Sequence, residues 1–195
     1  MSQHNEADDL VATMTDGYKP GEKKDLNELQ QLDANDESLN KWKASLGLNQ
    51  AEIMFPDDPR TVIVKSLVLD AGGHKIEMDV SSSEKIAELK DRVIVIKEGA
   101  EYFFKVAFYV QREVVSGLKF LQQVKRLGLP VDKTEGMCGS YGPKNELQEK
   151  VFPLATAPSG MMARGTYTVR SKFVDDDNNC HLEWNWTMKI KDDWK

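Results

Sequence analysis

The chain has 195 residues, of which 40% are hydrophobic and 30% are charged. This length and composition are typical of one ordinary domain with an appendage, and no stretch approaches the roughly 20 apolar residues of a membrane-spanning helix. The formal net charge is −6, and all of the excess negative charge lies in residues 1–58. Because binding a polyanion needs a basic face, we expect no binding to nucleic acid and favour a basic protein segment as partner.

Residues 1–58 are predicted to form a mobile acidic arm that contains two short helices. One helix is expected at about residues 25–32, where Asp25 and Glu28 resemble a capping box. A second helix is expected at 36–46, where leucines and a tryptophan share one face. Isolated helices of this length are marginal in water, so the arm should become helical when its apolar faces meet a surface. Permanent docking of both helices on the main domain remains an alternative.

Residues 59–195 are predicted to form one all-β domain, which follows the chain-breaking sequence at residues 55–59. Period-two patterns predict several strands and one short helix capped by a serine. The strands are expected at residues 61–69, 75–80, 93–97, 102–110, 118–124, 166–173 and 182–190, and the helix at 81–90. Short strands separated by Gly, Pro and Asp turns indicate an antiparallel sandwich.

Trp184 and Trp186 face the same side of the last predicted strand. Two neighbouring inward indoles either fill the core or line a cavity between the sheets. Periodicity alone favours a filled core, because large aromatic side chains usually dominate cores. The cavity remains the alternative at this point.

Other polar and glycine-rich segments carry no catalytic or metal-binding pattern. The run 175–179 fails the EF-hand template and is interpreted as a solvated turn that could present carboxylates to a partner. The glycine-rich run 136–142 lacks the features of a phosphate-binding loop and is interpreted as an irregular connection. Cys180 and His181 have no second ligand pair at metal spacing. We therefore expect no enzyme activity, no cofactor and no metal.

The first residues show neither the basic start nor the apolar run of a secretory signal. We therefore expect a cytosolic protein in which Cys138 and Cys180 are free thiols. An adhesion module of the immunoglobulin type is disfavoured, because it would need a signal sequence and a Cys…Trp…Cys core.

Several collinear strings resemble the Rho GDP-dissociation inhibitor family, from about Tyr18 to the end of the chain. These strings are LDANDESL at 32–39, REVVSGLK at 112–119, VDKT at 131–134, GSYGP at 139–143, APSGMMARGTY at 157–167, FVDDD at 173–177, HLEWNW at 181–186 and DWK at 193–195. The resemblance implies an immunoglobulin-like antiparallel β-sandwich with a flexible N-terminal arm. It also implies a pocket between the sheets for the geranylgeranyl group of a Rho-type GTPase.

The function implied by the resemblance is binding of prenylated, GDP-bound Rho, Rac or Cdc42-type GTPases. The inhibitor would block GDP release and extract the GTPase from membranes as a 1:1 complex, without inserting stably into the membrane itself. The alternative is a general carrier of prenyl lipids that has no preference for a nucleotide state.

The resemblance also implies roles for individual residues. The prenyl pocket would be formed by Leu69, Ile94, Tyr102, Val114, Val169, Trp184 and Trp186. The GTPase would be bound by Tyr18, Asp36, Leu39, Trp42, Asp176 and Asp177, and Thr166 is a possible regulatory phosphosite. Three positions depart from the family pattern: Ile94 replaces a common aromatic, Val93 replaces a phosphorylatable serine, and Ala155-Thr156 replace acidic residues.

Overall fold

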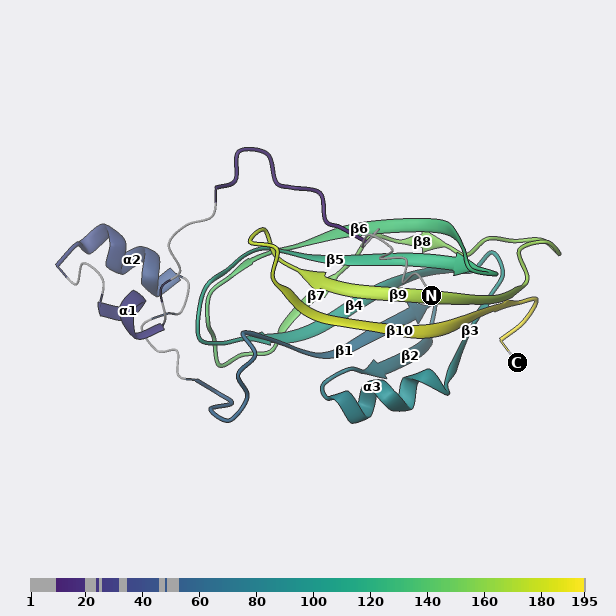
Figure 1. Cartoon of the computed structure of the whole chain (residues 1–195), viewed down its shortest axis with the longest axis horizontal. Coiled ribbons are helices and arrows are strands. Elements are labelled where there is room, and N and C mark those ends of the chain that lie inside the picture. The colour runs from purple at the N-terminus through teal and green to yellow at the C-terminus, as the bar shows by residue number, and fades with distance from the viewer. Residues whose placement is uncertain are drawn as a thin grey trace, which may run out of the picture.

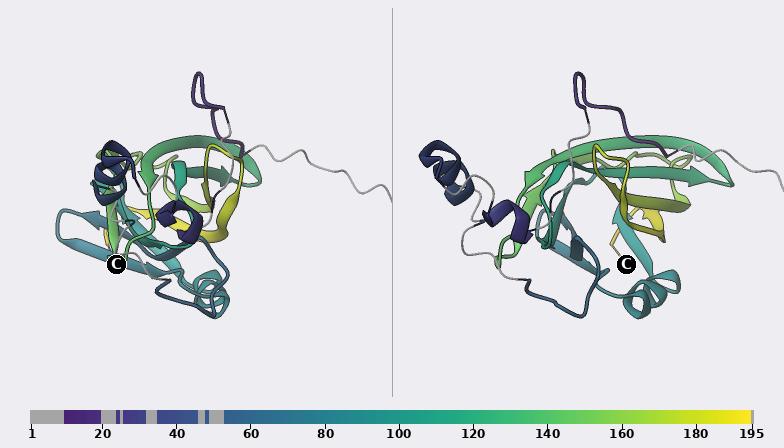
Figure 2. Two further views of the ribbon diagram at one scale, coloured as in Figure 1. Left: turned by 90° about the vertical axis from the view of Figure 1, so that its left-hand side faces the viewer. Right: turned by 60° about the vertical axis from the view of Figure 1, so that its left-hand side comes forward.

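Two β-sheets face one another and enclose the core of the molecule (Figure 1). The computed structural model describes residues 10–19, 24, 26–31, 35–45, 48 and 53–194. Helices α1 (Leu26–Gln31) and α2 (Glu37–Ser45) lie beyond one end of the sandwich, as the three views in Figures 1 and 2 agree. The fold is thus an all-β sandwich with a helical N-terminal segment, as the sequence predicts.

The first sheet has the strand order β2-β1-β4-β7, and the short β8 also pairs with β4. These strands are β1 (Val62–Ala71), β2 (His74–Asp79), β4 (Glu101–Val110), β7 (Gln148–Val151) and β8 (Ala155–Thr156). All of the pairs in this sheet are antiparallel, and a register shift interrupts β1 between Val64 and Ser66.

The second sheet has the order β3-β10-β9-β5-β6. Its strands are β3 (Val93–Lys97), β5 (Val115–Arg126), β6 (Leu129–Tyr141), β9 (Gly165–Val174) and β10 (Cys180–Lys191). Edge strand β3 runs parallel to β10, whereas the other pairs are antiparallel. Helix α3 (Ser83–Lys90) connects β2 of one sheet to β3 of the other, and the Ser82 hydroxyl accepts a hydrogen bond from the Lys85 amide at 3.3 Å.

The core lies between the inner faces of the two sheets. Alternation in β10 places Trp184, Trp186, Met188 and Ile190 in this core, while Glu183 stays exposed. Phe120 and Phe173 stack at a centroid distance of 4.8 Å, and both are buried. The period-two pattern of the sequence therefore identified the inward face of the last strand correctly.

The glycine-rich run 136–142 is not an irregular connection, because residues 136–141 belong to β6. The glycines are misleading here, since glycine usually weakens strands. Gly136 is needed at this place: a Cβ atom would lie 2.6 Å from the ring of Phe152. Close approach of an aromatic ring explains the glycine without a break in the strand.

The turn between β9 and β10 also differs from the expectation of a solvated turn. Asp175 and Asp176 are only 4% and 8% exposed. One Asp175 oxygen accepts hydrogen bonds from the backbone amides of Asp177 and Asn179 at 3.0 and 2.8 Å. The other oxygen lies 2.9 Å from Nε2 of His181. The first carboxylates of the run thus organise the turn and face the protein interior.

Within the described residues, Cys138 is a buried free thiol and Cys180 an exposed one. No helix in this part of the chain is long and apolar enough to cross a membrane. The described ranges also contain no cluster of three or more His, Cys, Asp or Glu residues that could hold a metal ion.

Candidate functional site: an apolar cavity between the sheets

A cavity of about 650 Å³ lies between the two sheets. The strand ends that supply its lining are at the end of the sandwich away from α1 and α2 (Figure 1). Its volume falls in the roughly 300–1,000 Å³ range of small-molecule pockets. The lining comes from the start of β4, the ends of β5 and β10, the middle of β6, the start of β9 and the connection between β7 and β8. It comprises Tyr102, Phe103, Phe104, Phe120, Gln122, Val124, Arg126, Val131, Asp132, Thr134, Glu135, Gly136, Phe152, Pro153, Leu154, Ala155, Thr156, Pro158, Tyr167, Val169, Trp186, Met188 and Ile190.

The inner wall of the cavity is aromatic. Phe104 lies across the sandwich from Phe120 and Trp186, with ring centroids 6.3 and 6.4 Å apart. Phe120 in turn lies 5.2 Å from Phe152. Burial raises the pKa of Tyr102 above its usual value, so this phenol stays neutral at physiological pH. The inner wall therefore offers rings and methyl groups, which suit a hydrocarbon ligand.

The two buried side chains of the lining that carry N–H groups, Gln122 and Trp186, are paired within the protein. The indole N–H of Trp186 donates to the Ser171 hydroxyl at 3.0 Å, and the Gln122 side chain donates to the same oxygen at 3.3 Å. Asp132 and Glu135 are exposed on β6. The polar side chains of the lining that remain accessible are thus the exposed ones, and a few polar groups beside apolar walls are typical of ligand pockets.

Three of the predicted pocket residues, Tyr102, Val169 and Trp186, line this cavity. Three others, Leu69, Ile94 and Trp184, are buried in the adjoining core and are not part of the lining. Val114 is half-buried in the connection between β4 and β5 and does not line the cavity.

Sequence reasoning missed the phenylalanines Phe104, Phe120 and Phe152 as lining residues. Alternation could have found Phe104, because it shares a strand face with Tyr102. No local signal marks Phe152, which follows a four-residue strand and reaches the cavity only through the chain's return between β7 and β8.

The N-terminal segment 10–19 lies on the outer side of the second sheet. Leu10 is fully buried against Leu121 and Val174. Lys119 donates from Nζ to the Asp176 carboxylate at 2.7 Å, and the same carboxylate accepts from the Thr15 hydroxyl at 2.8 Å. We call residues 10–19 the docked segment.

Tyr18 and the two predicted acidic GTPase contacts meet each other in this region. The Tyr18 hydroxyl donates to Asp177 at 2.8 Å. Partial burial and this hydrogen bond raise the pKa of Tyr18. The Asp176 and Lys119 side chains are only 5% and 3% exposed, so the Asp176 carboxylate is occupied inside the chain. A GTPase contact at Asp176 would therefore require the docked segment to move.

Asp36 begins α2 as its capping residue. One carboxylate oxygen accepts from the amides of Ser38 and Leu39 at 2.8 and 3.0 Å, which satisfies donors that the helix leaves free. Leu39 is half-buried. The backbone of Trp42 lies in α2, but its side chain lies outside the described residues.

Helices α1 and α2 are joined by polar contacts. Lys43 is almost fully buried and donates from Nζ to the Gln30 carbonyl at 3.3 Å. Gln30 donates to the Leu48 carbonyl at 2.8 Å. The short helices thus form one unit in this structure.

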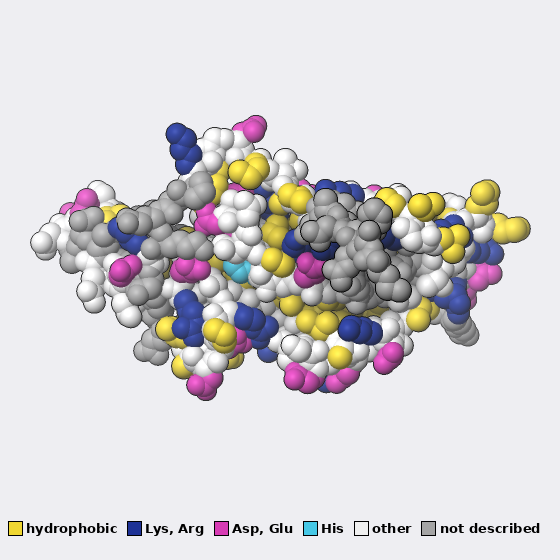
Figure 3. Space-filling view, viewed as in Figure 1, with side chains coloured by type: hydrophobic (Ala, Val, Ile, Leu, Met, Phe, Trp, Pro, Cys, Tyr) yellow, Lys and Arg dark blue, Asp and Glu magenta, His cyan; other side chains and the backbone are white. Residues whose placement is uncertain are grey.

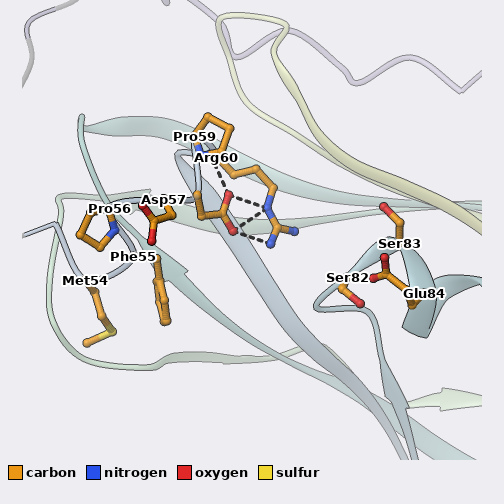
Figure 4. A pocket seen from close by; sticks show the side chains of 10 residues that line it. Met54, Phe55, Pro56, Asp57, Pro59, Arg60, Ser82, Ser83 and Glu84 are labelled. Carbon is orange, nitrogen blue, oxygen red and sulfur yellow. Dashed lines mark hydrogen bonds and ion pairs between the residues drawn. The ribbon is translucent and has the colours of Figure 1, made fainter.

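A second hollow, of about 700 Å³, lies between residues 54–60 and the start of α3 (Figure 4). The guanidinium of Arg60 binds the Asp58 carboxylate through two nitrogens, at 3.0 and 2.6 Å. The Arg60 hydrogen bond lowers the pKa of Asp58. Gln111 donates to the carbonyls of Asp58 and Arg60 at 2.9 Å each, so these contacts hold the linker to the sandwich.

Comparison with known proteins identifies the family. The model of the family described as RHO protein GDP dissociation inhibitor matches residues 2–193. The chain belongs to this family. It is 42% identical over 179 residues to human Rho GDP-dissociation inhibitor 1, covering 91% of this chain and 87% of that protein.

Further relatives come from a yeast and a nematode. The Rho GDP-dissociation inhibitor of Schizosaccharomyces pombe is 42% identical over 90% of this chain and 86% of its own length. A probable Rho GDP-dissociation inhibitor of Caenorhabditis elegans is 44% identical over 89% of this chain and 91% of its own. Members of the family are regulatory binding proteins, so this chain is not an enzyme.

Proposed function

We propose that this inhibitor binds GDP-bound, prenylated Rho-family GTPases in a 1:1 complex and buries the geranylgeranyl group in the cavity between the sheets. It slows the release of GDP and removes the GTPase from membranes into the cytosol. The observation that carries this proposal is the aromatic cavity of about 650 Å³ between the sheets.

The cavity supplies the part of the free energy of extraction that comes from burying the prenyl group. Each CH₂ group that leaves a membrane for water costs about 0.8 kcal/mol, so a chain of roughly 20 carbons costs on the order of 10 kcal/mol or more. Burial between Phe104, Phe120 and Trp186 offsets this cost. Because lipid and protein interiors differ little in polarity, the cavity alone only balances the membrane.

The additional contacts would come from the arm. Asp36, Leu39 and Trp42 lie on α2 or at its start, and we propose that they contact the switch regions of the GTPase. Asp177 lies near the docked segment and is proposed to meet a basic group of the GTPase. Ordering of the arm on binding costs free energy, so the complex remains releasable.

A vesicle experiment tests the proposal. The full chain is mixed with vesicles that carry geranylgeranylated, GDP-bound Rho or Rac, and the GTPase in the supernatant is measured. We expect the GTPase to be released in proportion to the inhibitor. No release at excess inhibitor would contradict the proposal, and equal binding of a prenylated peptide and of the whole GTPase in either nucleotide state would favour a general prenyl carrier.

The role of the cavity can be tested with Gly136→Ala. The added methyl group would meet the Phe152 ring at 2.6 Å, so the ring must shift within the cavity wall. We expect the affinity for a geranylgeranylated peptide to fall by about tenfold, as overpacking of this kind typically costs about 1–3 kcal/mol. The double variant Gly136→Ala/Phe152→Leu frees the space and should recover most of the affinity. Unchanged affinity in the single variant would place the lipid elsewhere.

A further inference from the structure

The end of the molecule around the cavity opening exposes an unusual number of large aliphatic side chains. Two segments, the hairpin tip at residues 125–133 and the loop at 157–166, carry most of them, and Leu154 adds another. The exposed fractions are 95% for Leu127, 69% for Leu129, 55% for Val131, 60% for Leu154, 85% for Met161 and 88% for Met162. We call these six side chains the tip surface. Figure 3 shows hydrophobic side chains gathered at this end of the molecule, and large exposed apolar patches mark binding surfaces.

The backbone conformation of the turn at the tip of the β5–β6 hairpin is unfavourable for Leu127. Leu127 has φ +51° and Gly128 has φ +82°, so both central residues of this two-residue turn have positive φ. Such turns favour Asn followed by Gly, because Asn tolerates this backbone conformation. A leucine here is strained and almost fully exposed, so neither turn geometry nor folding explains it.

The loop 157–166 is held in place, so its exposed methionines do not reflect a loose segment. Arg126 donates to the carbonyls of Met162 and Arg164, the latter at 2.9 Å, and its guanidinium lies 5.3 Å from the centre of the Tyr167 ring. Glu98 accepts from the amide of Gly160 at 3.0 Å. These contacts connect the loop to the hairpin and present both tips together.

The tip surface is continuous with the cavity. Val131 and Leu154 belong to it and also line the cavity opening, from β6 and from the β7–β8 connection. A hydrocarbon chain could therefore pass from a medium that contacts the tips into the cavity without crossing water. This continuity distinguishes the tip surface from the isolated exposed residues elsewhere in the described chain.

The charges near the tips differ from those of the whole protein. Residues 125–133 and 157–166 contain four basic residues and one acidic residue, whereas the whole chain has a net charge of −6. The basic residues are Lys125, Arg126, Lys133 and Arg164, and the acidic one is Asp132. Arg164 is paired with Glu98 at 2.6 Å and with Asp192 at 3.4 Å, so the remaining positive charge comes from the hairpin, where Lys133 also donates to the Val11 carbonyl at 3.2 Å. Exposed aliphatic groups beside basic residues match the surface of an anionic lipid leaflet, which attracts Lys and Arg and accepts apolar side chains.

We propose that the tip surface is a membrane-docking surface, which inserts shallowly into an anionic leaflet and sets the cavity opening against the lipid. This inference rests on the proposed function of the cavity. Docking would let the prenyl group move directly from the bilayer into the protein, so it should act on the rate of extraction. It should not change the affinity for the prenyl group once the lipid is in the cavity.

Two variants of the full chain test the proposal: Leu127→Asn and Met161→Ser/Met162→Ser. The matched control is Leu147→Ser, which alters an exposed leucine in the β6–β7 connection, outside the tip surface. Extraction of geranylgeranylated Rho is followed over time with phosphatidylcholine vesicles that do or do not contain phosphatidylserine. Binding of a geranylgeranylated peptide in solution is measured in parallel, together with the thermal midpoint.

We expect the methionine double variant to extract at least about tenfold more slowly from anionic vesicles, since shallow insertion depends on the buried apolar area. Leu127→Asn should slow extraction as well, while its thermal midpoint stays equal or rises because the turn is relieved of strain. The peptide affinity should stay within about twofold for both variants and for the control, because none of the changed residues lines the cavity and distant substitutions act independently.

The outcomes separate this inference from the proposed function. Extraction by both tip variants at the wild-type rate would overturn membrane docking and leave the lipid pocket intact. Loss of peptide affinity would show that the tips belong to the pocket, and weaker binding to unprenylated GTPase would show that they contact the GTPase; either result overturns the inference. Failure of the wild-type chain to bind the peptide at all would overturn the proposed function itself.

Discussion

Trp184 and Trp186 show how two identical side chains on one strand face acquire different surroundings. Both are 2% exposed. The Trp186 indole N–H donates to Ser171, and the ring lines the cavity. The indole N–H of Trp184 has no hydrogen-bond partner in the described part of the chain. A buried donor without a partner costs about 1–3 kcal/mol, so the two residues should respond differently to replacement.

Trp184→Phe and Trp186→Phe provide the comparison. Both lose part of a ring, but only Trp186→Phe removes a hydrogen bond, and Trp184→Phe removes an unsatisfied donor. We expect Trp186→Phe to be more destabilising by about 1–2 kcal/mol in chemical unfolding. Equal losses of stability would indicate that Trp184 has a partner in solution, such as a bound water molecule.

The two thiols should differ in reactivity. Burial raises the pKa of Cys138 to about 12, whereas Cys180 is exposed. The thiolate is the reactive form, so Cys138 is almost entirely protonated at pH 8. We expect a thiol reagent to modify one cysteine per folded chain rapidly and two after unfolding. Rapid reaction of both thiols in the folded protein would contradict the burial of Cys138.

At the scale of an element, the Asp175 carboxylate stabilises the turn between β9 and β10. Burial alone would raise the pKa of Asp175, but hydrogen bonds from His181 and Asn179 outweigh it and leave the pKa below the ordinary value of 3.8. Because the folded-state pKa is lowered, this group stabilises the fold above that ordinary value and loses its effect as the pH falls through the folded-state pKa.

Asp175→Asn tests this role of the turn. At pH 7 we expect the free energy of unfolding to drop by about 1–3 kcal/mol, because an amide cannot accept all of the hydrogen bonds that the carboxylate accepts. The difference from wild type should shrink as the pH falls below the ordinary pKa of 3.8 toward the lower folded-state pKa. A difference that stays the same from neutral pH down through this region would show that the Asp175 charge does not stabilise the turn.

Gly117 allows the backbone at the start of β5 to pass close to Asp176 in the turn between β9 and β10. It has φ +59°, and a Cβ atom there would lie 1.8 Å from the Asp176 carboxylate. No other residue type fits this position without moving the buried pair of Lys119 and Asp176. The string that carries the family resemblance around Gly117 thus has a structural basis in this contact.

At the scale of the whole molecule, the docked segment ties the N-terminal region to the sandwich. Leu10 is buried against Leu121, and the Lys119 ammonium donates to the Thr13 carbonyl at 2.5 Å. The Thr13 amide donates to the Glu135 carboxylate at 3.0 Å. This segment lies on the outer face of the second sheet, whereas the cavity opens between the sheets. The docked segment nevertheless reaches the cavity wall, because Glu135 also lines the cavity.

A truncation tests the contribution of the docked segment. Deleting residues 1–19 exposes Leu121 and Val174 and opens the pair of Lys119 and Asp176 to water, whereas deleting residues 1–9 leaves these contacts in place. Loss of the buried leucine alone corresponds to about 1.5–3 kcal/mol. At about 2–4 °C per kcal/mol for a chain of this size, we expect the thermal midpoint to fall by about 3–12 °C for the longer deletion and to stay unchanged for the shorter one. Equal midpoints would show that the segment does not contribute to stability.

The sequence by itself determined the features that depend on neighbouring residues. Alternation along residues 182–190 identified the inward face of the last strand, and a serine followed by a helical pattern located α3. The collinear strings determined the family. These features are local or inherited as whole strings, so they can be recognised before the chain is folded.

Only the tertiary structure decided which residues that are distant in the sequence lie next to one another. Phe104, Phe120 and Phe152 come from three strands or connections, and their meeting depends on sheet pairing that no local pattern encodes. From the sequence, Asp176 was expected to be a solvent-exposed acid, but in the structure it accepts a hydrogen bond from Lys119, which is 57 positions away. Burial and charge pairing are properties of long-range contacts, and for that reason the fold had to be known before the cavity, the turn and the exposed tips could be interpreted.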